Sequence, residues 1–354
     1  MFRFDDLDEK RRRKIKQFVD LCRRHVSEYS VISADPTMLF MPVGLDLAHF
    51  VRDYGLLFES LGERQAYIIC STYWYFERKE NIDELVRLLN RFRDEYRNLS
   101  FIFLCNTPRQ LELFADNNIE SVFCSNNCFV DERLFFPIPD AEKSIDAVYD
   151  GRLADWKRHE LAASIDSLGL IYYALPWHED NSYMRGLIQR FEAARFFNHD
   201  AAGAYRRLTP GEVNAALNTC RVGLCLSAEE GAMYASVQYL LAGLPVVTTP
   251  SVGGRDIFFD DEIAITAEPT PQAIGDAVRE MIGRGLEAEY IRGKTLERLK
   301  VHRGYFVDLV QAIYDKHGVS RNFGGEWPNI FHNKMLRNLN HSETARQLGL
   351  SGRS

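Results

Sequence analysis

Short, continuously apolar segments alternate with amphipathic ones along most of the 354-residue chain. The segments AYIICST at 66–72 and SFIFLC at 100–105 are typical of buried strands. Between them, the segment 81–97 carries apolar residues at helical spacing. Uniformly apolar strands joined by helices indicate a mainly parallel sheet that is covered by helices on both faces. The sequence therefore predicts an α/β protein.

This alternation occurs in two sets, and a connecting stretch at 126–146 with two prolines and several acidic residues lies between them. A chain of this length can form two domains that each bury a core. We therefore predict two Rossmann-like, doubly wound domains, over 1–143 and 144–318. A polar tail follows at 319–354, and it can pack back on the N-terminal domain.

The charge and the apolar runs exclude several classes of protein. A net charge of −7 argues against a nucleic-acid binder, which is usually basic. No apolar run approaches the roughly 18 residues of a membrane span, and the N-terminus is charged where a signal peptide is apolar. The seven cysteines form no CxxC pair, which fits a reducing compartment. We expect a cytoplasmic protein.

The segment 9–28 is predicted to be a helix with Ile15, Phe18 and Val19 on one face and a run of Lys and Arg on the other. A solvated surface is one interpretation of the basic face. The alternative is peripheral contact with the inner face of a membrane, because basic amphipathic helices bind anionic lipid.

Polar residues and glycines gather after four strands of the second half, where ligands of open α/β sheets bind. They are Arg152 and Lys157 after AVYDG, Trp177, His178 and Glu179 after GLIYYAL, Glu229, Glu230 and Gly231 after VGLCLS, and Pro250, Gly253, Gly254 and Arg255 after VVTT. Two cations at the opening of a helix predicted near 155–168 can neutralise a diphosphate. Each feature also has an ordinary explanation: acidic residues suit the positive end of a helix dipole, and glycine pairs form turns.

Three stretches in this order resemble motifs of one enzyme family. VYDGRLADWKRHELAASI (148–165) is similar to the "GRL…K" opening of the C-terminal domain in the GT4, glycogen-synthase-like family of GT-B glycosyltransferases. SAEEGAMYASVQYLLAGLPVVTTPSVGG (227–254) resembles the central signature of that family, and CSNNCFVDERLFFP (124–137) resembles its interdomain segment. The resemblance covers about 120–280 and is weak before it. It implies a GT-B fold, with two Rossmann-like domains and a cleft between them.

The resemblance also implies roles for single residues. Glu230 matches the glutamate that binds the hydroxyls of the donor sugar, and Arg152 and Lys157 match the cations on the donor phosphates. Gln238 replaces a second glutamate that usually holds the ribose, about 12 Å further along a helix at 1.5 Å per residue. Met233 stands where the family often has glycine. The predicted donor-binding set also includes Gly151, Leu208, Glu229, Gly231, Ala232, Gly253 and Gly254.

In such enzymes the N-terminal domain binds the acceptor, and here the match is weakest. The chain has only Gly44 where the family usually has a glycine pair. His49 is the nearest candidate for the acceptor-side histidine of the family, although a structural role is the alternative. Tyr73 and Trp74 follow a strand end and either stack on an acceptor or fill the domain core.

These features and the resemblance together predict a glycosyltransferase that moves a sugar from a nucleotide-sugar donor to a saccharide, glycolipid or small-molecule acceptor. The resemblance implies that the configuration of the transferred sugar is retained. We expect it to need no metal and no cofactor, because fixed cations and helix N-termini can stabilise the charge on the departing phosphate. Asp260-Asp261-Glu262 is predicted to be a turn rather than a metal-binding cluster. One alternative is a nucleotide-sugar epimerase or hydrolase of GT-B architecture, which would need an acid/base pair. The other is a catalytically silent binding subunit, which Gln238 and the lack of a clear match to the acceptor-side histidine would suit.

Overall fold

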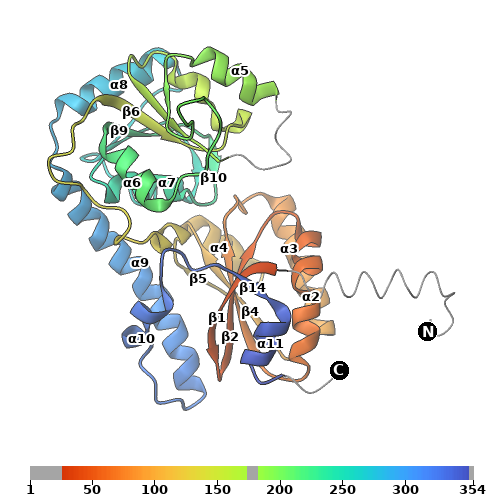
Figure 1. The fold of residues 1–354 in the computed structure, drawn as a ribbon. Helices are drawn as coiled ribbons and strands as arrows, with labels where there is room; N and C mark the ends of the chain where they lie inside the picture. Colours follow the sequence, from red (N-terminus) through yellow and green to blue (C-terminus); the bar gives the residue numbers. More distant parts are fainter. Residues whose placement is uncertain (1–25, 174–181, 351–354) are drawn as a thin grey trace. The chain divides into compact units, whose positions relative to one another are not determined.

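The computed structural model describes residues 26–173 and 182–350, which form two compact units (Figure 1). The second unit is Phe123–Phe306, and the first unit contains the chain before it and after it. The domain boundary predicted at residue 143 therefore lies inside the second unit. No helix in the described part of the chain is long and apolar enough to cross a membrane.

The second unit begins earlier than predicted because the connecting stretch is bound to a long helix, α9 (Ala288–Lys316). Arg303 of α9 donates to both carboxylate oxygens of Glu132, at 2.9 and 2.7 Å. It also donates to the backbone carbonyls of Cys128 at 2.8 Å and Val130 at 2.7 Å. Charged hydrogen bonds of this kind are among the stronger ones in proteins. The stretch predicted as a linker is thus part of the second unit.

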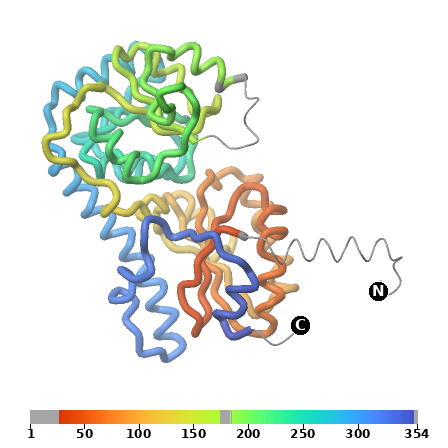
Figure 2. The backbone as a smooth tube through the Cα atoms, in the orientation of Figure 1, coloured from red at the N-terminus to blue at the C-terminus, as the bar shows by residue number. Residues whose placement is uncertain are grey.

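The first unit is built on a six-stranded sheet in the order β14-β1-β2-β3-β4-β5. Its strands are β1 (Val26–Ala34), β2 (Thr37–Val43), β3 (Ala66–Thr72), β4 (Leu99–Cys105), β5 (Ser121–Phe123) and β14 (Arg337–Asn340). β2, β3 and β4 are parallel, with Thr37 opposite Ala66 and Ala66 opposite Leu99. β1 is antiparallel to both of its neighbours. Figure 2 shows the C-terminal segment returning to place β14 beside β1.

In the described part of the chain, the helices of the first unit are α2 (Leu47–Leu61), α3 (Lys79–Glu95), α4 (Pro108–Asp116), α10 (Phe323–Ile330) and α11 (His341–Gln347), together with the last part of α9. Aromatic residues of α2, α3 and α4 belong to one buried core. Phe50 and Phe58 of α2 meet Phe92 of α3 with ring centroids 6.2 and 5.9 Å apart. β3 is buried along its whole length, as a central parallel strand covered on both faces should be. The predicted helix at 9–28 lies outside the described residues except at its end, where β1 begins instead.

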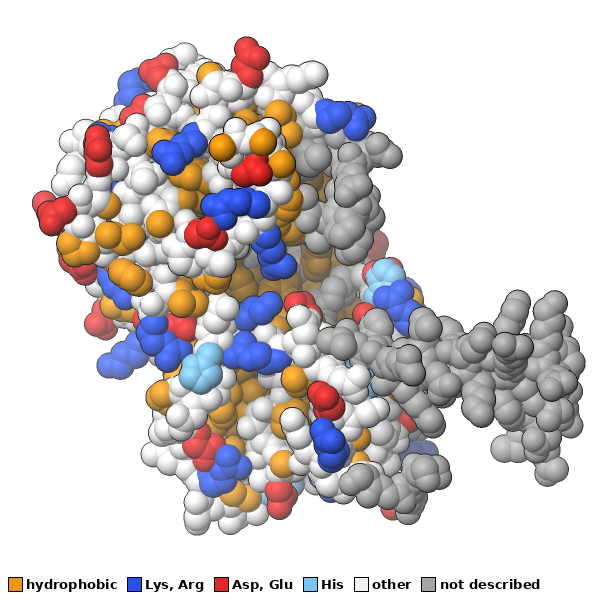
Figure 3. Space-filling view, in the orientation of Figure 1, with side chains coloured by type: hydrophobic (Ala, Val, Ile, Leu, Met, Phe, Trp, Pro, Cys, Tyr) orange, Lys and Arg blue, Asp and Glu red, His pale blue; other side chains and the backbone are white. Residues whose placement is uncertain are grey.

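The second unit has a six-stranded, all-parallel sheet in the order β13-β11-β9-β6-β7-β8. Its strands are β6 (Ile145–Asp150), β7 (Leu168–Ile171), β8 (Arg195–Phe196), β9 (Cys220–Cys225), β11 (Val246–Thr248) and β13 (Ala264–Thr266). Its helices are α5 (Ser182–Arg190), α6 (Pro210–Asn218), α7 (Tyr234–Leu241) and α8 (Pro271–Gly283), together with the first part of α9. On the visible face of this unit, charged side chains of both signs are interspersed (Figure 3).

The helix predicted near 155–168 is absent from the structure, although these residues are described. Two short 3-10 turns, Asp155–Lys157 and His159–Ala162, replace it. Arg158 between them has φ of +53°, which a right-handed helix cannot accommodate. Lys157 therefore lies in a 3-10 turn, and its predicted place at the opening of an α-helix is wrong.

Candidate functional site

The predicted donor residues gather at the carboxyl ends of β6, β9 and β11, which are adjacent in the sheet of the second unit. Lys157, after β6, donates from Nζ to a carboxylate oxygen of Glu230, after β9. The two side chains are only 13% and 14% exposed. An ammonium group has three donors and a carboxylate accepts on two oxygens, so both groups keep bonding capacity beyond the pair.

The glutamate pair and the glycine pair lie side by side in a small parallel ladder. β10 (Glu229–Glu230) pairs with β12 (Val252–Gly253), and Glu230 lies opposite Gly253. Gly253 has φ of +92°, a conformation that is costly for other residues. The amide of Gly254 donates to the carbonyl of Gly231 at 3.0 Å. The ladder thus fixes the backbone that carries the Glu230 side chain.

The ladder also corrects two predictions. α7 begins only at Tyr234, so the glutamates lie in a strand before the helix rather than at its first turn. The interpretation of Glu229 and Glu230 as partners of a helix dipole is therefore wrong. Only the last part of the segment from Glu230 to Gln238 is helical, so the spacing of about 12 Å along a helix does not apply.

Arg255 is the side chain that joins the ends of β9 and β11, and it is fully buried. It donates to the carbonyl of Ser227, to Thr248 Oγ1 at 2.6 Å and to the carbonyl of Thr249 at 2.5 Å. Its guanidinium also pairs with Asp256, with Nε and Oδ1 2.6 Å apart. The sequence placed Arg255 at the strand end but gave it no role, because its partners are fixed only by the fold.

Arg158 has a similar function on the other side of the site. From its left-handed backbone position it donates to the carbonyl of Leu226 at 2.6 Å and to Thr249 Oγ1 at 2.7 Å. The Tyr149 hydroxyl donates to the Lys157 carbonyl at 2.7 Å. These contacts hold the turn that carries Lys157 against the ends of β9 and β11. Sequence analysis did not identify Arg158.

Arg152 lies beside Tyr173, which follows β7. Its Nε and an NH2 nitrogen lie 3.1 and 2.9 Å from the Tyr173 hydroxyl, and its guanidinium carbon is 5.1 Å from the ring centroid. Tyr173 is 45% exposed, so this pair is accessible to a ligand. The structure therefore brings Lys157 to Glu230 directly and holds Arg152 on the aromatic residue of the adjacent strand end. The predicted cluster Trp177–Glu179 lies outside the described residues.

Met233 does not present a free amide. Its N–H donates to Asn127 Oδ1 at 2.9 Å, and the Asn127 side-chain amide donates to the Gly254 carbonyl at 3.3 Å. Asn127 is fully buried and joins the connecting stretch to the segments that contain Met233 and Gly254.

Among the other predicted residues, Gln238 and Leu208 are partly exposed, on α7 and before α6 respectively. Neither of these two described residues takes part in the ion pair or the Arg255 network.

Asp150, at the end of β6, is a titratable group that the sequence did not single out. Burial raises the pKa of its carboxyl to about 7, although the nearby Lys157 charge acts in the opposite direction. Its backbone amide donates to the Tyr239 hydroxyl at 2.5 Å, which anchors α7 to β6.

Among the described residues, no group of three or more His, Cys, Asp or Glu side chains is arranged to hold a metal ion. In the turn at 260–262, Asp260 is paired with Lys294 at 2.8 Å and with Arg298.

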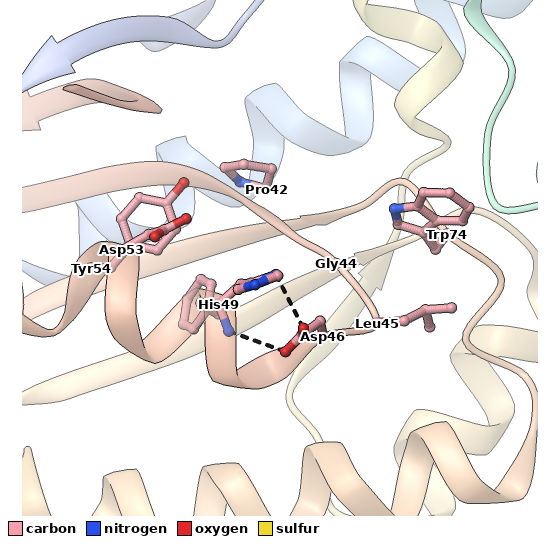
Figure 4. A pocket seen from close by; sticks show the side chains of 9 residues that line it. Pro42, Gly44, Leu45, Asp46, His49, Asp53, Tyr54 and Trp74 are labelled. Atoms are coloured by element: carbon pink, nitrogen blue, oxygen red, sulfur yellow. Dashed lines mark hydrogen bonds and ion pairs between the residues drawn. The ribbon is translucent and has the colours of Figure 1, made fainter. Parts of the chain in front are cut away.

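The acceptor-side candidates of the first unit are partly brought together (Figure 4). Gly44, His49 and Trp74 line one pocket of about 480 Å³ at the ends of β2 and β3. His49 Nδ1 lies 3.1 Å from Asp46 Oδ2. Asp46 also caps α2 through the amides of residues 48 and 49. Tyr73 is described but is not one of the residues that line this pocket.

Comparison with known proteins supports the fold. No family model matches the sequence, and no curated protein does. HepE from Anabaena, solved with UDP and glucose, is similar over 77% of this chain and 83% of its own, with a TM-score of 0.54 and 15% identity. TarM from S. aureus, solved with Fondaparinux, alpha-GlcNAc-glycerol and UDP, is similar over 73% of this chain and 58% of its own, with a TM-score of 0.52 and 14% identity. The α/β architecture of two Rossmann-like units is thus confirmed, and the fold is GT-B.

Proposed function

We propose that this protein is a glycosyltransferase that moves a sugar from a nucleotide-sugar donor to a saccharide, glycolipid or small-molecule acceptor. The observation that carries the proposal is the part-buried Lys157–Glu230 pair at the ends of β6 and β9. In this interpretation Glu230 accepts from sugar hydroxyls and Lys157 donates to the diphosphate. Two proteins of the same fold were solved with UDP, which supports a nucleotide ligand.

The chemistry follows from where charge develops. Cleavage of a sugar–phosphate bond leaves negative charge on the departing diphosphate. Fixed cations in a partly desolvated site stabilise such charge more strongly than water-exposed cations do. Lys157 is held by its backbone contacts, and Arg152 is oriented by Tyr173. We propose that these two cations supply that stabilisation without a metal, and that the configuration at the transferred carbon is retained.

The first test is calorimetric titration of the full chain with UDP, GDP, ADP, TDP and CMP. We expect one nucleotide to bind at micromolar strength. Loss of a charged hydrogen bond is worth about 1.5–3 kcal/mol, so Lys157→Ala or Arg152→Ala should weaken binding by about 10- to 100-fold. Arg221→Ala is the matched control, because Arg221 is half-exposed and pairs with Asp146 instead. Absence of nucleotide binding would contradict the proposal.

The second test separates an enzyme from a silent subunit. Glu230→Gln keeps the size of the side chain but loses the charge that faces Lys157. We expect this variant to bind the nucleotide and to lose release of nucleoside diphosphate from the matching nucleotide-sugar in the presence of saccharide acceptors. NMR of the product determines whether the configuration is retained, and addition of EDTA tests metal dependence. A wild-type protein that binds the nucleotide without turnover would support the silent subunit instead.

The cytoplasmic location of the protein also remains a prediction.

A further inference from the structure

Arg158 has a backbone conformation that is unusual for its residue type. Among the residues that the structure describes, the non-glycine residues with a left-handed φ are Arg158, Asn118, Asp140 and Asn333. Asparagine and aspartate tolerate this conformation because their short polar side chains can form local hydrogen bonds, but arginine has no such advantage at φ of +53°. Strain of this kind persists only where the surrounding structure imposes it, and it is concentrated at functional sites. The contacts of Arg158 should therefore show what imposes the strain.

Arg158 joins the two short turns that replace the predicted helix. Its amide donates to the Asp155 carbonyl at 2.9 Å in the first turn, and its carbonyl accepts from the Leu161 amide at 3.1 Å in the second. Lys157 is the last residue of the first turn and directly precedes this junction. The orientation of the turn that carries Lys157 therefore depends on the conformation that residue 158 holds.

The Arg158 side chain fixes this junction to distant parts of the chain. Its Nε donates to the Leu226 carbonyl at 2.6 Å, and an NH2 nitrogen donates to Thr249 Oγ1 at 2.7 Å. Leu226 follows β9 and Thr249 follows β11, so the guanidinium bridges the ends of two adjacent strands. Both partners are fully buried, and charged hydrogen bonds in such surroundings are among the stronger ones in proteins. These two contacts can hold residue 158 in its left-handed conformation.

The other described contacts of Lys157 do not provide the same constraint. The Tyr149 hydroxyl donates to the Lys157 carbonyl at 2.7 Å, which holds one backbone group. The ammonium donates to Glu230, whose carboxylate is the group proposed to bind sugar hydroxyls. A lysine side chain is a flexible four-carbon stem, so its ammonium stays in one place only if its backbone is fixed. Arg158 supplies that fixed backbone.

We propose that Arg158 is a positioning residue of the candidate site. Its guanidinium holds the turn at 155–158 against the ends of β9 and β11, and this holds the Lys157 ammonium beside Glu230. The strained backbone at residue 158 is a consequence of this arrangement. The expected effect on nucleotide binding rests on the proposed function, whereas the placement of the ammonium does not.

Acetylation of the full chain with limiting acetic anhydride, followed by mass spectrometry of its peptides, measures this placement without any ligand. The Lys157 side chain is 13% exposed and ion-paired, so it should react slowly compared with Lys79, which is 81% exposed. Arg158→Gly removes the guanidinium and relieves the strained backbone, and we expect several-fold faster acetylation of Lys157. Asp140→Gly is the matched control, because Asp140 is an exposed residue of the same unit with φ of +60°. It should leave the rate at Lys157 unchanged.

Two further variants separate the side chain of Arg158 from its backbone. Arg158→Ala keeps the strained position but lacks the guanidinium, so it should resemble Arg158→Gly in the acetylation of Lys157. If the backbone alone placed Lys157, Arg158→Gly would react like the wild type and only Arg158→Ala would react faster, which would overturn the proposal. Thr249→Val removes one of the two partners of the guanidinium at nearly constant volume. It should give a smaller increase, and it tests the same contact if Arg158→Gly does not fold.

Nucleotide titration then tests whether Arg158 acts through Lys157. Arg158→Gly should weaken nucleotide binding by about tenfold, and it should have no further effect in a protein that already carries Lys157→Ala. Equal effects in both backgrounds would overturn the positioning role. A wild-type protein that binds no nucleotide would contradict the transferase proposal, and the acetylation rates would still decide the role of Arg158. Unchanged acetylation in a protein that binds nucleotide would overturn the positioning role alone.

Discussion

Arg255 shows how much of the candidate site depends on one buried charge. It donates to groups at the ends of β9 and β11, and its only anionic partner among these contacts, Asp256, is partly exposed. Because its own side chain is fully buried, substitution leaves carbonyls and a hydroxyl without donors in a place that water cannot reach.

We therefore expect Arg255→Met to lower the free energy of unfolding by about 3 kcal/mol or more. Urea denaturation followed by circular dichroism measures this. Arg279→Met on α8 is the control, because Arg279 is 55% exposed and should change stability by less than about 0.5 kcal/mol. Equal effects of the two substitutions would show that Arg255 does not organise the strand ends.

His159 provides a pH-dependent test at the same scale. Burial lowers the pKa of its imidazole from 6.5 to about 3, and its ring lies 4.6 Å from that of Tyr149. Between about pH 3 and 6.5 the unfolded chain therefore binds a proton that the folded chain does not. The free energy of unfolding must then decrease as the pH falls through this window.

His159→Phe removes this proton and keeps a ring against Tyr149, so thermal unfolding should depend less steeply on pH between about 4 and 6.5. His302, whose pKa burial lowers to about 4, keeps part of the dependence. The control is His332→Phe, at an exposed position. A slope unchanged by His159→Phe would mean that this ring is protonated in the folded protein.

At the scale of single elements, the β10–β12 ladder depends on one glycine. Gly253 has φ of +92° and ψ of −164°, a conformation that is almost restricted to glycine. Gly253→Ala should cost about 1–3 kcal/mol and weaken nucleotide binding, because the ladder positions Glu230. Calorimetry and thermal unfolding of the same samples measure both effects.

Gly304→Ala is the matched control for this glycine. Gly304 lies within α9, where an added Cβ meets no atom within 4 Å. A helical glycine is less favourable than alanine, so this variant should gain about 0.5–1 kcal/mol and bind the nucleotide normally. If Gly253→Ala left the nucleotide affinity unchanged, the β10–β12 ladder would not be required for nucleotide binding.

The elements that the sequence predicts well are those with a long periodic pattern. α3, β3 and β4 begin and end close to the predicted residues because their apolar spacing is regular. β10 and β12 have two residues each, which is too short for any period. The turns on both sides of Arg158 depend on its hydrogen bonds to residues 68 and 91 positions away. No local pattern encodes such contacts.

The same limit applies to the candidate site. The sheet order brings predicted strand ends together, so Lys157 and Glu230 could be anticipated as neighbours. Asn127 could not, because its contact with Met233 spans 106 residues and joins the connecting stretch to α7. Which side chains meet at the strand ends can be predicted from the order of the strands. Which side chains hold the loops in place can be seen only in the folded structure.

For the whole molecule, the chain leaves the first unit at Val122 and returns to it at Val307. The returning segment completes the first sheet, because β14 pairs with β1 from Val26 opposite Asn340 to Tyr29 opposite Arg337. The Tyr29 hydroxyl donates to Thr344 Oγ1 at 2.6 Å. The first unit is therefore not a continuous stretch of chain, and its stability should depend on residues near the C-terminus.

Removal of the chain from residue 332 onward should consequently destabilise the first unit selectively. The truncation exposes the edge of β1, and it removes Leu348, which is buried in the core of this unit. We expect a lower first transition in calorimetric unfolding, and nucleotide binding retained by the second unit, to which the deleted segment does not belong. Leu348→Ala is the milder variant, and a loss of about 2–4 kcal/mol in the first unit is expected for it. If either change abolished nucleotide binding at a temperature where both units are folded, the two units would have to be treated as one cooperative structure.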